Sequence, residues 1–300
     1  MINFLSKFKY AYIFSGTLVV ASLVLLFTLG LKTGIDFTGG TLMEIGFNES
    51  LPSNRDLQKT LESLNLKSLT LQASENKSVL IRYAAEDDEL NQQVMEMINK
   101  DYPETIQLRA DFINSTVSKE LKRKSIQAII WAIFGILAYI AWAFRKVSRP
   151  VESWKYGLGA IFALVHDIAI TVGIFTILGH YWGLEVGIPF VAALLTILGY
   201  SVNDTIVVYD RTRENIIRSS QKEKFPEIVN RSLNETLGRS INTSLTVIIT
   251  LLAIYFFGGE SIKDFSLALI IGIVFGTYSS IFVATALLVT SYKLQLKNKN

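Results

Sequence analysis

Two aspartates lie inside long apolar stretches of this sequence, where ionisable side chains are rare. Asp167 directly follows His166 in the run ALVHDIAITV, and Asp204 lies in the run GYSVNDTIVVYDRTRE. A charge at membrane depth costs about 3 kcal/mol on insertion scales, so it tends to mark an ion path or a paired site. An adjacent histidine and aspartate can take and pass protons, because burial and their mutual interaction tune both groups. For Asp167 and His166 the sequence leaves two interpretations open: a proton site, or a polar pair packed against polar neighbours.

Asp204 belongs to the most polar of these apolar stretches. Its polar neighbours are Ser201, Asn203 and Thr205. A helix of this composition should face protein, water or both, because lipid cannot satisfy its polar groups. Asp204 is still inside the apolar run, whereas three charged residues lie where the run ends. They are Asp210, Arg211 and Arg213, which we interpret as anchors at the cytoplasmic interface of the membrane.

A second polar stripe begins at Arg239. Thr243, Thr246 and Thr250 follow at intervals of four, three and four residues, which places all four side chains on one helical face. Threonines at this spacing either bond the carbonyls of their own helix or serve a functional role. The arginine needs a carboxylate partner or water, and Asp204 is the nearest plausible carboxylate by depth. We therefore expect Arg239 to be the electrostatic partner of Asp204.

Small residues recur at two further places. The sequence TGIDFTGGT surrounds Asp36 with glycines and predicts a turn, in which Asp36 is either a turn residue or a functional one. Near the C-terminus, Gly272, Gly276 and Ser280 recur at intervals of four, the spacing that lets membrane helices approach closely. We expect this second set to serve helix packing.

The rest of the sequence excludes many kinds of chemistry. There is no cysteine and there are only two histidines, which removes thiolate sites and leaves little for a metal. No phosphate-binding Gly-Lys-Ser/Thr loop, His-Glu-x-x-His or Gly-x-Ser-x-Gly pattern occurs. The net charge is only +3, with lysines and arginines scattered among loops. We expect no cofactor, no metal, no enzymatic activity and no nucleic-acid partner.

Six apolar runs supply the elements that must position the polar residues. Half of the residues are apolar, 18% are charged and the mean hydropathy is positive, a balance typical of a membrane protein. Runs of about 20 residues are long enough to cross about 30 Å of hydrocarbon. The runs are Ala11–Leu31, Ile126–Phe144, Tyr156–Gly179, Val186–Val208, Ile241–Phe257 and Phe265–Thr290. The first exceeds a normal signal-peptide core, so we interpret it as an uncleaved span.

The distribution of lysine and arginine predicts the orientation of these spans. Basic residues gather at both termini, between spans two and three, and between spans four and five. They are Lys7, Lys9, Arg145, Lys146, Arg149, Lys155, Arg211, Arg213, Arg218, Lys222, Lys224, Arg231, Lys293, Lys297 and Lys299. The opposite loops, around 180–185 and 258–264, hold a single lysine. By the positive-inside rule, both termini are cytoplasmic and the segment 36–124 lies outside the cytoplasm.

The segment 36–124 is the one predicted soluble domain. Its pattern predicts strand Thr41–Phe47, helix Asn54–Leu64, strand Lys67–Ala73, strand Val79–Tyr83, helix Glu86–Lys100 and strand Ile106–Ile113. The order βαββαβ favours a ferredoxin-like fold. Ser53 can cap the first helix, and the acids 86–89 suit the dipole of the second better than a metal site.

The predicted fold class is therefore a polytopic α-helical membrane protein with six transmembrane helices. A small α+β domain of ferredoxin-like βαββαβ order, extracytoplasmic, separates helices 1 and 2. The expected organisation is an N-terminal tail with the first helix (1–35), the extracytoplasmic domain (36–124), a five-helix transmembrane bundle (125–292) and a cytoplasmic tail (293–300).

Several motifs together resemble the SecF family of protein-export subunits. They are GIDFTGGT, ALVHD, GYSVNDTIVVYDRTRE, NRSLNETLGRSINTS and FGGESIKDFSLALIIG. They occur in the family's order and spacing and cover essentially the whole chain, and the one-plus-five arrangement of spans also matches. The resemblance implies a proton-driven protein of the resistance-nodulation-division superfamily in the bacterial inner membrane. It also implies that Asp204 is the proton-coupling carboxylate and Arg239 its basic counterpart.

The resemblance further implies a set of partners. SecD would supply a related six-span bundle, and the pair would use the proton motive force to assist export through the SecYEG channel after the SecA motor has acted. Unfolded translocating polypeptide would be the substrate, with YidC and YajC as further associated proteins. Two alternatives remain: half of a proton-coupled small-molecule or lipid exporter, and a membrane scaffold or insertion chaperone without ion flux. The small outer domain favours SecF over an exporter, and titration of Asp204 would distinguish it from a scaffold.

Overall fold

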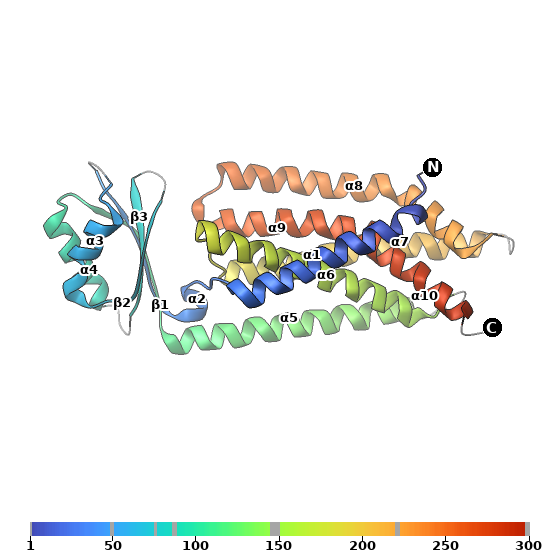
Figure 1. Ribbon diagram of the computed structural model, residues 1–300, viewed down its shortest axis with the longest axis horizontal. Helices are drawn as coiled ribbons and strands as arrows, with labels where there is room; N and C mark the ends of the chain where they lie inside the picture. The colour runs from blue at the N-terminus through green and yellow to red at the C-terminus, as the bar shows by residue number, and fades with distance from the viewer. Residues whose placement is uncertain are drawn as a thin grey trace. The chain divides into compact units, whose positions relative to one another are not determined.

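The computed structural model describes residues 2–48, 51–74, 77–85, 89–144, 151–219 and 223–297 (Figure 1). The chain forms two compact units. One, the helical unit, comprises residues 1–31, 128–184 and 189–300, and the other, the α+β unit, comprises residues 32–127 and 185–188. The acids 86–88 and the basic residues Arg145, Lys146, Arg149, Lys222 and Lys299, which entered the sequence predictions, lie outside the described residues.

Six helices in the described part of the chain are long and apolar enough to cross a membrane, which confirms the predicted fold class. After a short 3-10 turn (Leu5–Lys7) they are α1 (Phe8–Leu29), α5 (Ser115–Ala143), α6 (Ser153–Trp182), α7 (Ile188–Arg218), α8 (Phe225–Phe257) and the last span, which starts with α9 (Glu260–Ser279). Most helices extend beyond the predicted apolar runs. Helix α8 begins at Phe225 rather than Ile241, because its first turns are polar and therefore invisible to an apolar window.

The last span is continuous but changes its winding in the middle. A π-helical segment (Ser280–Ala284) joins α9 to α10 (Thr285–Lys297). Such segments insert an extra residue into a helix and occur frequently at functional sites. The segment begins directly after Ser279, a residue of the polar cluster described below.

Helix α9 lies at the centre of the helical unit. It packs against both α6 and α8, and α1 packs against α6 (Figure 1). A Cβ atom on Gly272 would clash with Ile197 of α7, and one on Gly276 would lie 3.1 Å from the Cβ of Ser201. The small-residue stripe therefore lets α7 and α9 approach closely, which confirms its predicted packing role.

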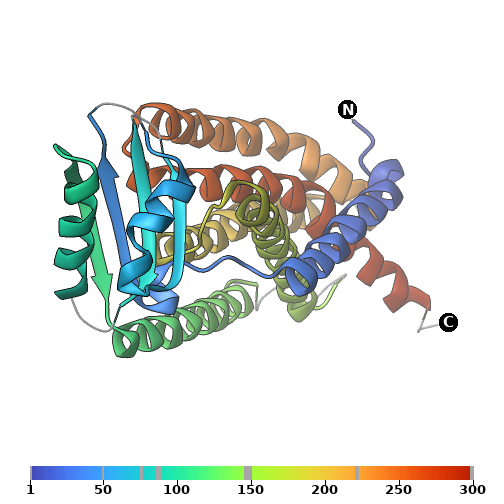
Figure 2. The same ribbon diagram turned by 60° about the vertical axis from the view of Figure 1, so that its left-hand side comes forward.

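The α+β unit contains a four-stranded antiparallel sheet in the order β2-β3-β1-β4. The strands are β1 (Gly40–Gly46), β2 (Lys67–Ala73), β3 (Ser78–Ala84) and β4 (Ile106–Ile113). Helices α3 (Asn54–Thr60) and α4 (Glu89–Asp101) cover one face (Figures 1 and 2). This is the ferredoxin-like arrangement predicted from the sequence.

The core of this unit follows the predicted alternation. Met43 and Ile45 of β1, Ile81 of β3, Leu57 of α3 and Val94 of α4 are completely buried. One helix prediction needs correction at its C-terminal end. Helix α3 stops at Thr60 and a 3-10 turn (Glu62–Leu64) follows, because the chain tightens before the left-handed residue Asn65. Ser53 caps α3 as predicted, and its Oγ accepts a hydrogen bond from the Asp56 amide at 3.2 Å.

Candidate functional site

Asp167 of α6 is the centre of a buried polar cluster. Its side chain is completely buried. Oδ2 accepts hydrogen bonds from the Ser201 hydroxyl of α7 at 2.6 Å and the Ser279 hydroxyl of α9 at 2.8 Å. Oδ1 lies 2.9 Å from Nδ1 of His166. One carboxylate therefore connects three helices of the unit.

His166 completes this cluster on the side of α6. Its ring stacks on Tyr278 of α9, with the ring centroids 6.1 Å apart. Nε2 is buried and has no hydrogen-bond partner in the described part of the chain. When Nδ1 donates to Asp167, Nε2 carries the free lone pair of the ring. The pair can thus hold a proton at a defined atom, which is the chemistry expected of a relay.

A second polar contact follows one helical turn along α7. The hydroxyls of Thr205 and Ser280 are 2.9 Å apart, and the Ser280 hydroxyl also lies 3.3 Å from the Ser201 carbonyl. Ser280 is the first residue of the π-helical segment. Polar contacts therefore continue along the whole α7–α9 seam from Asp167 to Thr205.

Asp204 lies on α7 three residues after Ser201, and the polar residues of α8 influence its carboxylate. It is 4% exposed, and its Oδ2 has no hydrogen-bond partner among the described residues. Two polar residues of α8 influence the Asp204 carboxylate: Ser240 through its hydroxyl and Arg239 through its charge. The Ser240 hydroxyl is itself buried and without a partner in the described chain. A buried carboxylate with so few donors is poorly stabilised as an anion.

Arg239 interacts with Asp204 only at a distance. Its side chain is exposed on α8, and it forms no ion pair with any residue that the structure describes. The expected direct pairing with Asp204 is therefore not formed in this conformation. An arginine side chain is long and flexible, so a small movement of Arg239 changes the distance between its guanidinium and the Asp204 carboxylate.

The threonine stripe on α8 serves its own helix. Thr243 donates to the Arg239 carbonyl at 2.9 Å, Thr246 to the Thr243 carbonyl at 2.9 Å, and Thr250 to the Thr246 carbonyl at 3.0 Å. Of the two interpretations, backbone bonding is the one observed. The stripe is nevertheless exposed, and so is Asn203 on α7. These residues do not join the Asp167 cluster.

The predicted cytoplasmic anchors form ion pairs. Arg213 binds Asp210 at 2.6 Å, and Arg211 binds both Glu214 and Glu235 at 2.6 Å. Glu235 belongs to α8, so the Arg211–Glu235 pair connects α7 to α8. This agrees with a structural role for the charged residues beyond Asp204.

Asp36 belongs to the α+β unit, whereas the polar cluster around Asp167 belongs to the helical unit. It is part of the short helix α2 (Ile35–Thr38), which ends at Gly39. Gly39 and Gly40 have φ angles of +75° and +113°, a region that favours glycine. A Cβ on Gly40 would lie 2.5 Å from the Tyr83 carbonyl of β3. The two glycines thus fix the turn that presents Asp36.

Sequence reasoning missed Ser240, Ser279 and Tyr278. A signal existed for the two serines, since Ser240 adjoins Arg239 and Ser279 adjoins Ser280 of the small-residue stripe. A lone serine is common in membrane helices, however, and its partner on another helix cannot be identified from spacing. Within the described residues no group of three potential ligands could hold a metal ion.

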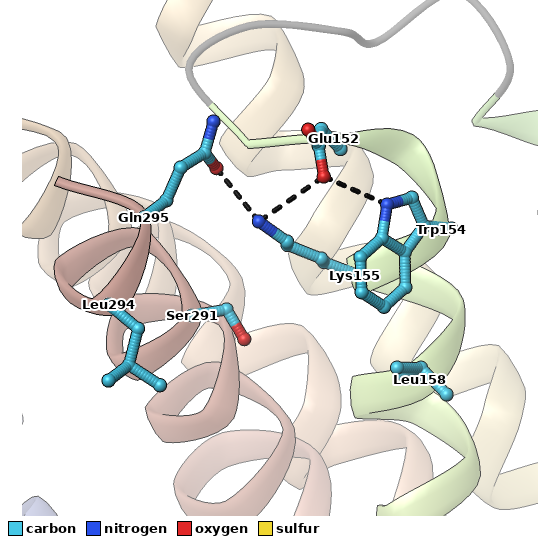
Figure 3. A pocket seen from close by; sticks show the side chains of 7 residues that line it. All are labelled: Glu152, Trp154, Lys155, Leu158, Ser291, Leu294 and Gln295. Atoms are coloured by element: carbon cyan, nitrogen blue, oxygen red, sulfur yellow. Dashed lines mark hydrogen bonds and ion pairs between the residues drawn. The ribbon is translucent and has the colours of Figure 1, made fainter. Parts of the chain in front are cut away.

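A shallow groove lies between the ends of α6 and α10 (Figure 3). Lys155 reaches Gln295 of α10 at 3.0 Å and Glu152 at 3.3 Å, and the Trp154 indole donates to Glu152 at 2.8 Å. The side chains of Glu152, Trp154, Lys155 and Gln295 thus bind one another in the groove. It contains none of the residues that the sequence singled out for chemistry.

Comparison with known proteins identifies similar families and relatives. A family described as "Protein export membrane protein SecD/SecF, C-terminal" matches residues 93–294, and one described as "SecD/SecF GG Motif" matches residues 24–50. The chain is 43% identical over 297 residues to protein translocase subunit SecF of Thermobaculum terrenum, covering 95% of this chain and 92% of that protein. It is 37% identical to protein translocase subunit SecF of Haemophilus influenzae, covering 95% and 84% respectively.

Two solved structures are similar as well. The crystal structure of SecDF, a translocon-associated membrane protein from Thermus thermophilus, has a TM-score of 0.84 and 34% identity. A crystal structure of SecDF in a super-membrane-facing form has a TM-score of 0.70 and 33% identity. These alignments cover 96% and 99% of this chain but only 38% and 39% of the solved chains. This chain therefore spans less than two fifths of those proteins.

Proposed function

This chain belongs to the SecF family of protein translocase subunits, and we propose that within it Asp204 is the residue that couples proton movement to export. The observation that supports this most is the state of its carboxylate. Asp204 is buried at membrane depth, and one of its carboxylate oxygens has no hydrogen-bond donor among the described residues. The Asp167 carboxylate, in contrast, has three hydrogen-bond partners. An unsatisfied buried carboxylate is the group that gains most from binding a proton.

The role of Arg239 in this proposal is to change the charge state of Asp204. A cation that approaches a buried carboxylate favours its anion, and withdrawal of the cation favours the neutral acid. Arg239 is exposed and unpaired in the described chain, so it is free to move. The membrane potential supplies about 2.3 kcal/mol per charge per 100 mV. The transfer of several protons would therefore provide enough free energy for an ordinary domain motion.

We propose SecD as the partner that covers the exposed polar face of α7 and α8. Arg239, Thr243 and Asn203 are exposed on spans that are otherwise apolar. A guanidinium facing lipid would be costly, so a second membrane subunit or a water-filled interface should cover it. Both solved relatives are SecDF chains of which this chain matches about two fifths, and SecD would provide the remainder.

The wider assembly is part of the same proposal. With SecD, this chain would use the proton motive force to complete export of unfolded polypeptide through SecYEG after SecA, with YidC and YajC as further contacts. Both termini would be cytoplasmic and residues 36–124 extracytoplasmic, where the ferredoxin-like domain would bind polypeptide or a partner and catalyse nothing. In support, the start of α1 and the end of α10 lie at the same end of the helical unit (Figure 1). The relatives are SecF subunits, so the exporter and scaffold alternatives are not favoured.

We assign a secondary proton-holding role to Asp167 and His166. The free Nε2 of His166 can accept a proton, while Asp167 holds Ser201 one turn before Asp204 and thereby sets the rotation of α7. Thr205 continues this seam through Ser280. We propose that three further polar residues support the proton-coupling ones: Asn203, Thr243 and Asp36.

The Asp204→Asn variant tests the central proposal, because it keeps size and hydrogen bonding but cannot titrate. We expect normal assembly with SecD and loss of the export that depends on the proton motive force, with partial activity for Asp204→Glu. Asp210→Asn is the matched control, since Asp210 lies on the same helix but is exposed and paired with Arg213. Normal export by Asp204→Asn with an intact proton gradient would show that this carboxylate does not couple protons.

A further inference from the structure

The carboxylate of Asp36 contacts the first residue of α7. Its Oδ2 accepts a hydrogen bond of 2.7 Å from the backbone amide of Ile188, a residue 152 positions later in the chain. Both residues belong to the α+β unit, in which 185–188 is the short segment that leads into α7. The GG-containing turn and the start of α7 are therefore joined within one compact unit.

This contact has the properties of a helix cap. The first amides of a helix have no partner within it, and an acceptor that binds one of them stabilises the helix by about 1 kcal/mol. Pro189 follows Ile188 and has no amide to offer, so Ile188 presents the first available donor of α7. A carboxylate also interacts favourably with the positive end of the helix dipole.

The backbone next to the cap is paired on both sides. Val186 donates to the Lys32 carbonyl at 2.9 Å, and the Gly34 amide donates to the Val186 carbonyl at 2.9 Å. These bonds form a parallel bridge between Thr33 and Val186. The segment that leads into α7 is thus held like a short strand against residues 32–34.

Charged side chains reinforce the same attachment. Glu185 forms ion pairs with Lys32, at 3.7 Å, and with Arg82 of β3. Burial and the neighbouring charge of Arg82 lower the pKa of Lys32. The attachment therefore reaches from the start of α7 into the central sheet of the α+β unit.

We propose that Asp36 is a positioning residue that fastens α7 to the α+β unit and so transmits movement of α7 to that unit. This inference rests on the proposed role of Asp204. Asp204 lies on the same continuous helix, 16 residues after Ile188, or about 24 Å along its axis at 1.5 Å per residue. A displacement of α7 caused by a change of charge at Asp204 reaches its first residue, and the cap passes it to the sheet.

The experiment uses the full chain with its partner subunit in reconstituted membranes. Hydrogen exchange of the peptide containing Ile188 reports the cap directly, and export with and without a protonophore reports the coupled activity. For Asp36→Ala we expect about fivefold faster exchange at the first turn of α7, as for the loss of one cap. We expect the protonophore-sensitive part of export to fall with it. Asp36→Asn should rescue both, because its amide oxygen still accepts from Ile188.

Ser53→Ala is the matched control, since it removes a cap from α3 in the same unit without touching α7. It should leave exchange at Ile188 and coupled export unchanged. Unchanged exchange in Asp36→Ala, or faster exchange with undiminished protonophore-sensitive export, would overturn the proposal. If Asp204→Asn also exports normally while Asp36→Ala shows both defects, the attachment stands and the proton role of Asp204 fails, so the two failures are distinguishable.

Discussion

Removal of the Asp167 carboxylate should destabilise the helical unit strongly. Three side chains contact this one carboxylate, from Ser201, Ser279 and His166. Hydrogen bonds to a charged group contribute about 1.5–3 kcal/mol each, or about 4.5–9 kcal/mol together, against about 3 kcal/mol for placing the aspartate at membrane depth. The net loss of unfolding free energy in Asp167→Ala should therefore be about 1.5–6 kcal/mol. Asp167→Asn should lose less, because its amide oxygen still accepts from the serines.

Thermal unfolding in detergent, followed by tryptophan fluorescence, measures this loss. A change of 1 kcal/mol shifts Tm by about 2–4 °C in a protein of about 200 residues, so Asp167→Ala should unfold at least about 3 °C below the unmodified chain. Asp210→Ala is the control, since it removes an exposed carboxylate whose ion pair with Arg213 contributes at most about 1 kcal/mol.

A double-mutant cycle isolates the contact itself. Asp167→Ala combined with Ser201→Ala should cost less than the sum of the two single changes, because both remove the same hydrogen bond of 2.6 Å. The reasoning is refuted if Asp167→Ala unfolds at the same temperature as Asp210→Ala. Strict additivity in the cycle would show that the Ser201 contact contributes nothing to stability.

Two further predictions concern packing and orientation. Gly272→Leu should prevent close packing of α7 on α9 and lower Tm by several degrees, because even a Cβ at this position clashes with Ile197. Gly135→Leu is the control, since no atom lies within 4 Å of a Cβ built on that glycine. Equal Tm values for the two variants would contradict the packing argument. Because the chain has no cysteine, single cysteines can report its orientation. An impermeant maleimide should label Glu62→Cys in right-side-out vesicles but Lys297→Cys only after permeabilisation, and the reverse pattern would invert the proposed topology.

Much of the fold could be predicted from local sequence patterns. The six spans follow from uninterrupted apolar runs, and the strands Lys67–Ala73 and Ile106–Ile113 match the predicted bounds because their alternation is strong. Element ends were less predictable. The first turns of α8 are too polar for an apolar window, although Phe225, Ile228, Val229 and Leu233 are buried there at helical spacing. The 3-10 turn after α3 is a local change of winding at a helix end, where bounds are least predictable.

The sequence by itself also determined which residues to consider, since Asp167, His166, Asp204 and Arg239 are ionisable groups within or beside apolar runs. Only the tertiary structure decided how they differ. It surrounds Asp167 with hydroxyls from two other helices and leaves an oxygen of Asp204 without a donor among the described residues. It also brings Asp36 to the amide of Ile188, 152 positions away. The physical reason is that spacing along a chain specifies the face and depth of a side chain on its own helix, whereas its partners depend on which helices pack together and how each is rotated about its axis.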